Sequence, residues 1–385
     1  NYVLNNRGAM SAHVVTTMAM LGTPKALQKV DFISRKEKDK RTKASAIEAL
    51  ETAAKELKLT KDELLDKITP DFGISSNGVL EIDFGNRKFT MKITADLELS
   101  IIDENGKILK TLPKANKSDD AEKFKEGEFK FKEIKKELKE QVKMQKERLE
   151  SGLSKNRLWN KQNWLELFAL NPLMKQFAIG LIWGIYENGK VIKTFRYMED
   201  GSFTDINDDS FTIPENSFIG MIHPIELSKE DILKWKEQLK DYEISQPFNQ
   251  LDREIYILPK EKEELLSLND FEGYMVGRGT IKQKLYKLGW TNGTVEDAGC
   301  FYYYTKQMRE HNLNVDLDFM GDYMGNYDDF GDVPLYGIIF RDMKNNESKL
   351  LKDIPARLLS EIYYEIKKLA DSGSGFNADW KNCSW

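Results

Sequence analysis

The spacing of apolar residues changes near residue 70, and this change constrains the fold more than any other feature. Before it, apolar residues such as Met10, Val14, Met18 and Leu21 recur three or four positions apart, as on one face of a helix. After it, short runs such as Val79–Phe84 alternate apolar and polar residues, as in half-buried strands. The sequence therefore predicts an α+β fold.

The same patterns divide the 385 residues into segments. Small residues at helical spacing with short breaks predict the end of a HEAT-like helical-repeat array, in which each repeat needs a neighbour to bury its face. Asn105-Gly106 predicts a hairpin turn, because both positions favour positive φ. The expected segments are a helical-repeat segment (1–68), a small antiparallel β unit (69–117), a long helix with a helical connector (118–178), a mixed α+β domain (179–371) and a flexible tail (372–385).

Several element ends have local signals. Thr60 followed by Glu63 predicts a capping box, and Ser228 with Asp231 predicts a second helix start. Thr280 is expected to cap another helix. A strand is expected over 253–258, followed by a Glu-rich helix that starts at Pro259 and ends near residue 268.

The long helix predicted from residue 118 to about 152 is highly charged. Residues 107–150 contain 14 basic and 10 acidic side chains of alternating sign. Such a pattern is typical of a solvated helix laced with i,i+4 ion pairs. Binding of nucleic acid through this Lys-rich helix stays open as an alternative, although the net charge of −5 argues mildly against a DNA-coating protein.

Residues able to hold a metal or act as nucleophiles are few. The three histidines and two cysteines are scattered, so we expect no zinc site, no other metal and no cofactor. Two free thiols, no visible signal peptide and no apolar run of bilayer length indicate a cytoplasmic protein that does not enter a membrane. The chain starts at Asn1, within a helical pattern, and is interpreted as the C-terminal part of a longer protein.

The stretch KDYEISQPFNQLDREIY, residues 240–256, concentrates functional groups around one proline. Gln246 and Arg253 in this stretch, together with His223 and Arg196, are the candidate ligand-binding residues. His223 precedes a proline, which forces an extended backbone on it and helps to fix its ring. Two interpretations stand: a site for a small polar ligand, or a corner whose side chains satisfy backbone groups that lack regular partners.

Several phrases, taken together and in order, are similar to a known family. They are RKFT from Arg87, WGIY from Trp183, HPIEL from His223, QPFNQLDREIY from Gln246 and LGW from Leu288. They resemble the C-terminal region of bacterial MolR-type proteins, which often carry a WGR domain far upstream. The resemblance implies a domain of unknown function without agreed catalytic residues, and it places any nucleic-acid role mainly in upstream domains.

The leading functional prediction is a non-catalytic binding, scaffold or regulatory module of a large cytoplasmic protein. Its partner would be another protein or upstream domains of the same chain, because helical repeats offer partner surfaces. The catalytic constellations that would indicate an enzyme are missing. The alternatives are an enzyme or nucleotide-binding domain with its site near His223 and Arg253, and a module associated with nucleic acid.

Overall fold

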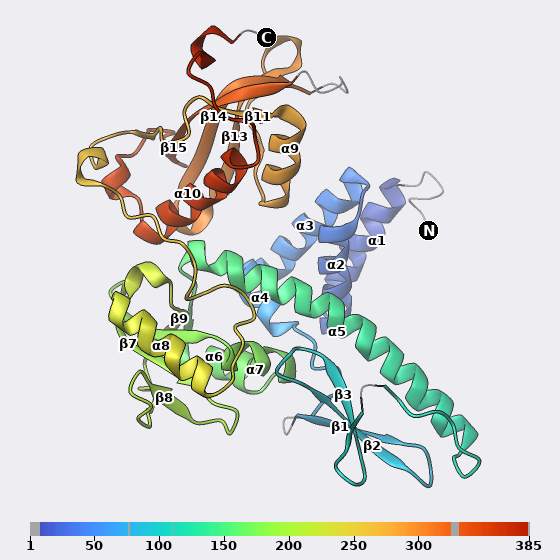
Figure 1. The fold of residues 1–385 in the computed structure, drawn as a ribbon. Helices are drawn as coiled ribbons and strands as arrows, with labels where there is room; N and C mark the ends of the chain where they lie inside the picture. Colours follow the sequence, from blue (N-terminus) through green and yellow to red (C-terminus); the bar gives the residue numbers. More distant parts are fainter. Residues whose placement is uncertain (1–7, 76–77, 110, 325–330, 384–385) are drawn as a thin grey trace. The chain divides into compact units, whose positions relative to one another are not determined.

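The computed structural model describes residues 8–75, 78–109, 111–324 and 331–383 (Figure 1). The chain divides into two compact units. The first runs to Lys143 and includes Lys161–Gly180, and the second consists of Met144–Asn160 and the chain from Leu181 onward. Helix α5 (Ala121–Lys155) starts in the first unit and ends in the second. The chain contains both helices and antiparallel sheets, which confirms the α+β class.

The first unit begins with short helices around a small apolar core. Alanines of the third helix, such as Ala46, Ala49 and Ala53, are buried, and their small side chains let the neighbouring helices approach closely. Val15 and Leu27 of those neighbours belong to the same buried cluster. The capping box between Thr60 and Glu63 is confirmed, since each side chain accepts a hydrogen bond from the other residue's backbone. The helices are α1 (Gly8–Met20), α2 (Pro24–Lys36), α3 (Lys40–Glu56) and α4 (Lys61–Lys67).

The expected small β unit follows, and in the described residues it is a sheet in the order β1-β2-β3-β4. Its strands pair antiparallel, and Gly106 has φ 80° in the predicted turn between the last two strands. Helix α5 starts beside this sheet, where the backbone N–H of Asp120 donates to the carbonyl of Phe84. The strands are β1 (Val79–Asp83), β2 (Lys88–Ile93), β3 (Leu99–Asp103) and β4 (Ile108–Leu109).

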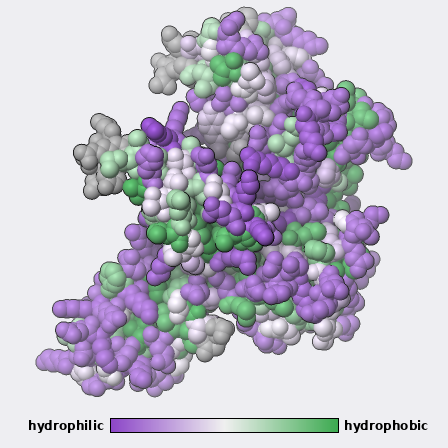
Figure 2. Space-filling view, turned by 180° about the vertical axis from the view of Figure 1, so that it is seen from behind, coloured by the Kyte–Doolittle hydropathy of each residue, from purple (hydrophilic) through white to green (hydrophobic). Residues whose placement is uncertain are grey.

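The charged helix predicted from residue 118 is confirmed as α5. Buried residues of α5 such as Phe131, Ile134 and Leu138 are spaced three or four apart, and Lys and Glu fill most of the other positions. The part of the molecule that carries β1–β4 and the first turns of α5 is largely hydrophilic on the face shown at the lower left of Figure 2. The connector that completes the first unit consists of α6 (Lys161–Trp164), the π-helical turn η1 (Leu165–Ala169) and α7 (Pro172–Ile179).

The second unit contains a sheet in the order β5-β9-β6-β7-β8, with helix α8 (Lys229–Asp241) packed on it (Figure 1). Asn188-Gly189 turns β6 into β7 as predicted, and Ser228 caps α8 by accepting a hydrogen bond from the Asp231 N–H. Trp235 and Leu239 of α8 are buried against the sheet. The strands are β5 (Leu158–Asn160), β6 (Ile182–Glu187), β7 (Lys190–Tyr197), β8 (Phe203–Asp205) and β9 (Phe218–Met221).

The second unit also contains a larger sheet in the order β12-β13-β14-β15-β11-β16, with β10 paired to β15. Helices α9 (Arg278–Lys287) and α10 (Ala356–Ala370) contribute to the core of this sheet (Figure 1). The strands are β10 (Ser267–Leu268), β11 (Tyr274–Gly277), β12 (Thr291–Asn292), β13 (Cys300–Met308), β14 (Leu313–Tyr323), β15 (Asp332–Asp342) and β16 (Gly375–Phe376).

Three local predictions were wrong. Residues 253–258 form no strand, because their backbone is bonded to side chains of α10 instead, as in the bond from Tyr256 N–H to Ser360 Oγ. The helix expected from Pro259 is reduced to the 3-10 turn η3 (Lys260–Lys262), after which β10 joins the sheet. Thr280 caps nothing, since α9 already begins at Arg278. Within the segment expected to be a flexible tail, 372–385, β16 (Gly375–Phe376) pairs with β11 at the sheet edge.

Candidate functional site

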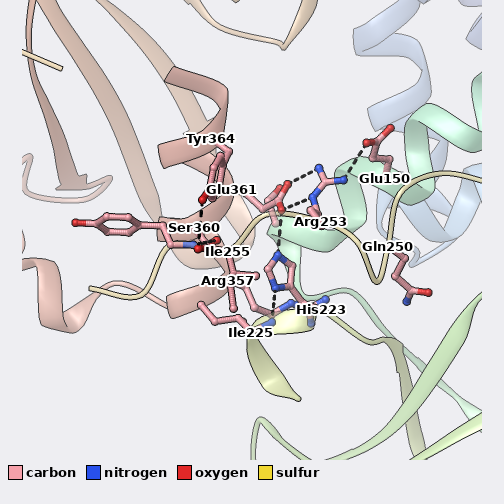
Figure 3. A network of polar contacts seen from close by, with 12 residues as sticks. Glu150, His223, Ile225, Gln250, Arg253, Ile255, Arg357, Ser360, Glu361 and Tyr364 are labelled. Carbon is pink, nitrogen blue, oxygen red and sulfur yellow. Dashed lines mark hydrogen bonds and ion pairs between the residues drawn. The ribbon is translucent and has the colours of Figure 1, made fainter. Parts of the chain in front are cut away.

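Two of the four candidate residues contact one further side chain, which was not among the predicted site residues. His223 begins the 3-10 helix η2 (Pro224–Glu226) after β9, and Arg253 lies in the irregular chain after α8. Both contact Glu361, a buried residue of α10 (Figure 3). A signal for Glu361 was present in the sequence, because this carboxylate borders the apolar stripe of its helix.

Glu361 is bonded through both carboxylate oxygens. Its Oε1 lies 2.5 Å from Arg253 Nε and 3.0 Å from His223 Nε2. Its Oε2 lies 2.7 Å from Arg253 Nη2, so the guanidinium grips the carboxylate as a fork. Arg253 extends the network to Glu150 near the end of α5, with Nη1 2.9 Å from Glu150 Oε1.

The hydrogen bonds of His223 fix its tautomer. Its Nδ1 accepts the backbone N–H of Ile225 at 3.2 Å and therefore carries no proton. The proton of the neutral ring must then lie on Nε2, which donates to Glu361. The ring is fully buried, with an exposed fraction of 0%.

Burial and charge pairing set the protonation states of the network. Burial alone would raise the pKa of Glu361, but the hydrogen bonds from His223 and Arg253, with the charge of Arg253, hold it at about 2. Burial lowers the pKa of His223 and outweighs the attraction of Glu361. The network at neutral pH is therefore a neutral histidine beside an Arg253–Glu361 ion pair.

A second polar cluster lies next to the first and is centred on Arg357 of α10. Arg357 Nη2 donates to the carbonyl of Met221 at 2.9 Å, and its Nη1 bonds the side chain of Asn156. The Tyr186 hydroxyl lies 2.9 Å from Glu226 Oε2, which also accepts the backbone N–H of His223. Burial raises the pKa of Tyr186, so the hydroxyl stays protonated.

Gln246 bonds other residues of the corner formed by residues 240–256. Its Nε2 donates to Gln250 Oε1 at 2.9 Å, and its Oε1 accepts the backbone N–H of Leu251. Gln250 is fully buried and bonds the N–H and carbonyl of Ile182 and the carbonyl of Ile222. Gln250 thus provides partners for the Ile182 N–H at the start of β6 and for the Ile222 carbonyl just after β9, and Gln246 is bonded to Gln250 and to the Leu251 N–H.

Arg196, the fourth candidate, lies apart from the other three. It sits on β7 opposite Ile182, and its guanidinium carbon lies 4.0 Å from the ring centroid of Tyr242. In the described residues no hydrogen bond joins Arg196 to His223, Gln246 or Arg253. Within that same part of the chain, no group of three or more His, Cys, Asp or Glu side chains could hold a metal ion.

Comparisons with known proteins find similarity to a domain family of unknown function and to an uncharacterised protein. Residues 106–290 match the family described as "Domain of unknown function (DUF4132)". The chain is 29% identical over 295 residues to "Uncharacterized protein YehI" of Escherichia coli (strain K12). The matched region covers 76% of this chain and 24% of that protein. The chain thus spans about a quarter of that relative's length. No solved structure gives a significant match.

Throughout the described residues, no helix combines the length and the apolar character that a bilayer span requires.

Proposed function

We propose that this chain is a non-catalytic binding module of a larger cytoplasmic regulatory protein, and that the network of His223, Arg253 and Glu361 is a structural joint. The observation that carries this proposal is the saturation of the network. Both ring nitrogens of His223 and both oxygens of Glu361 are bonded to protein groups, and the imidazole is fully buried. A general base must reach a substrate proton, and this histidine has no nitrogen left for one.

The partner that fits best is a further helical repeat of the same longer protein. Met10 and Val14 are 48% and 41% exposed and lie on one side of α1, opposite its buried Ala12 and Ala19. Leu21, which follows the last residue of α1, is 66% exposed. Terminal repeats of such arrays need a neighbour or a polar cap, and this stripe is apolar. The E. coli relative has about three quarters of its length outside the matched region, which leaves room for further repeats.

A regulatory role is supported by the resemblance to MolR-type proteins, whose upstream WGR domain would carry any contact with nucleic acid. The Lys-rich α5 supports direct nucleic-acid binding less well, because its lysines alternate with glutamates and pair with them, as in Lys132–Glu128.

The structural role of the joint is tested with a panel of ligands in thermal unfolding. Nucleotides, NAD, molybdate, divalent metals and short DNA and RNA are added to the wild-type chain and to His223→Ala and Arg253→Ala. A specific ligand raises the midpoint by mass action. We expect no rise that depends on either residue. A rise that both substitutions abolish would contradict the proposal and favour an enzyme or nucleotide-binding domain.

The binding role is tested by calorimetric titration with helical-repeat segments from the part of the longer protein outside residues 1–385. We expect binding that the double substitution Met10→Glu and Val14→Glu abolishes. Thr16→Glu is the matched control, because Thr16 is exposed on α1 but lies off the apolar stripe. Equal weakening by the control and the double substitution would refute binding through this face.

A further inference from the structure

The charged head group of Arg196 is buried without a hydrogen-bond acceptor. Its strand β7 presents it on the sheet face that α8 covers, as shown by Thr194, two residues earlier, which accepts a hydrogen bond from Trp235 Nε1 of α8. The exposed fraction of Arg196 is 0%, and in the described residues its Nε, Nη1 and Nη2 have no partner. Two other buried arginines of this unit bond oxygen acceptors instead. Arg357 bonds a backbone carbonyl and a side-chain oxygen, and Arg278 Nε donates to the carbonyl of Gly321.

An unpaired guanidinium in such a place is a large energetic liability. Arginine has five N–H donors and keeps its charge in proteins. Burying this charge without an acceptor costs several kcal/mol, and an apolar side chain of similar volume would pack at the same position without that cost. Burial lowers the pKa of Arg196, because the same loss of hydration disfavours the charged guanidinium. An acceptor that bonds the guanidinium N–H groups would offset this energetic cost.

The surroundings of Arg196 contain one half-exposed ring and one exposed carboxylate. The guanidinium faces the Tyr242 ring at 4.0 Å, which is a cation–π contact and leaves the N–H groups without an acceptor. Tyr242 is 43% exposed and ends α8, and its hydroxyl donates to Asp208 Oδ2 at 2.6 Å. One turn earlier on α8, the buried Gln238 Oε1 also lacks a hydrogen-bond partner in the described residues.

We propose that Arg196 is the base of an oxyanion-binding site that Tyr242 closes, and that its ligand is a small carboxylate or phosphate group. Both groups present two acceptor oxygens at the spacing of the guanidinium fork, which makes arginine their preferred partner. Tyr242 covers the site through a single hydrogen bond to an exposed residue, so displacing its side chain opens a path to solvent.

This inference goes beyond the proposed function, because such a site would exist whether or not α1 binds a further repeat. It is also separate from the His223–Glu361 joint, to which no described contact connects Arg196. A response to phosphate or molybdate that persists in His223→Ala and disappears in an Arg196 variant would belong to this site.

The rival explanation is that Asp208 is the internal counter-ion of Arg196 and pairs with it when Tyr242 moves. The two explanations give opposite expectations for Asp208→Asn. If Asp208 is the counter-ion, this substitution lowers the unfolding midpoint and no anion effect is present. If an external oxyanion is the ligand, the substitution removes a repelling charge and strengthens binding of the anion several-fold.

The experiment is thermal unfolding of the whole chain at constant ionic strength, with chloride replaced stepwise by inorganic phosphate or by acetate. We expect a saturable rise of the wild-type midpoint, and the anion that acts at the lower concentration identifies the ligand class. Arg196→Met should abolish the rise, and in chloride its midpoint should equal or exceed that of the wild type. It also controls for general salt effects.

Three outcomes would overturn the site: a wild-type midpoint that responds to neither anion, an equal response in Arg196→Met, or a response that Asp208→Asn leaves unchanged or weakens. If Arg196→Met does not fold, the surface substitution Asp208→Asn decides alone. Calorimetric titration of phosphate into the wild type and Asp208→Asn then measures the several-fold change in Kd directly.

Discussion

Arg253 grips both carboxylate oxygens of Glu361 across 108 residues of sequence, with Nε 2.5 Å from Oε1 and Nη2 2.7 Å from Oε2. The pair ties the chain after α8 to helix α10, and the second oxygen contact leaves the carboxylate little freedom to rotate. His223 adds a third donor from the end of β9. Three segments distant in sequence thus meet at one side chain.

Glu361→Gln should therefore destabilise the fold strongly. The substitution removes the negative charge and leaves the mostly buried Arg253 with only the half-exposed Glu150 as a charged partner. Breaking a buried ion pair from one side typically costs about 3–5 kcal/mol of unfolding free energy. The measurement is urea denaturation at pH 7. Glu150→Gln is the control and should cost less than about 1 kcal/mol, because that carboxylate is 39% exposed.

The joint should also give the fold a characteristic acid sensitivity. Between pH 4.5, the ordinary pKa of glutamate, and about 2, the unfolded chain holds a proton on Glu361 that the folded chain does not. Stability from this residue is therefore present above pH 4.5 and is lost as the pH falls towards 2. The pKa of His223 is lowered too, so its contribution is full above pH 6.5 and declines below that value.

Urea midpoints measured from pH 3 to pH 8 test both signs. The wild-type stability should fall on acidification, first below pH 6.5 and again below pH 4.5. His223→Gln should remove the first decline and Glu361→Gln the second. Variants whose profiles parallel the wild type would show that other groups cause the acid sensitivity.

Within the corner formed by residues 240–256, substitution of Gln250 should lower the unfolding free energy most. Its buried amide bonds three backbone groups of Ile182 and Ile222. Gln250→Ala removes the partner of the Ile182 N–H and of the Ile222 carbonyl, whereas the Ile182 carbonyl keeps the N–H of Ile222. Each group that loses its partner costs about 1–3 kcal/mol, and we expect a total loss of about 2 kcal/mol or more. Denaturation of Gln246→Ala provides the comparison. An equal loss in both variants would show that the corner does not depend on Gln250 in particular.

The sequence predicted those parts of the fold that depend on local chemistry. The capping box at Thr60, the Asn188-Gly189 turn and the apolar stripes of α5 and α10 are each set by residues a few positions apart. The chain after Arg253 was mispredicted, because its backbone bonds the side chain of a helix about 100 residues later instead of a neighbouring strand. No local pattern carries that information.

In the candidate site, too, the sequence identified residues with local signals but not the contacts between distant segments. His223 and Arg253 were found from their own neighbourhoods, but Glu361 lies 138 and 108 residues away from them. The sequence also placed Arg196 with them, although its side chain lies against Tyr242. Which charged residues converge depends on how α10 packs against β9 and the chain after α8, and this packing is a property of the tertiary fold.

Two glycines of α5 allow one more test, because the same substitution meets different surroundings at each. A methyl group on Gly127 would lie 2.6 Å from Ile82 Cγ2 and from a ring carbon of Phe84, in the close contact of the helix with the first sheet. At Gly152 the nearest atom is the flexible end of Met221, at 3.1 Å. Alanine gains about 1 kcal/mol over glycine inside a helix, whereas overpacking a core costs about 1–3 kcal/mol.

Gly127→Ala should therefore be neutral to destabilising by about 2 kcal/mol, and Gly152→Ala should be neutral or stabilising by up to about 1 kcal/mol. Urea denaturation of both variants, with hydrogen exchange of the β1 and β2 amides, checks the assignment. The exchange of these amides should accelerate only in Gly127→Ala, since that methyl group pushes on the sheet. A gain of stability in both variants would contradict the close contact between Gly127 and the side chains of Ile82 and Phe84.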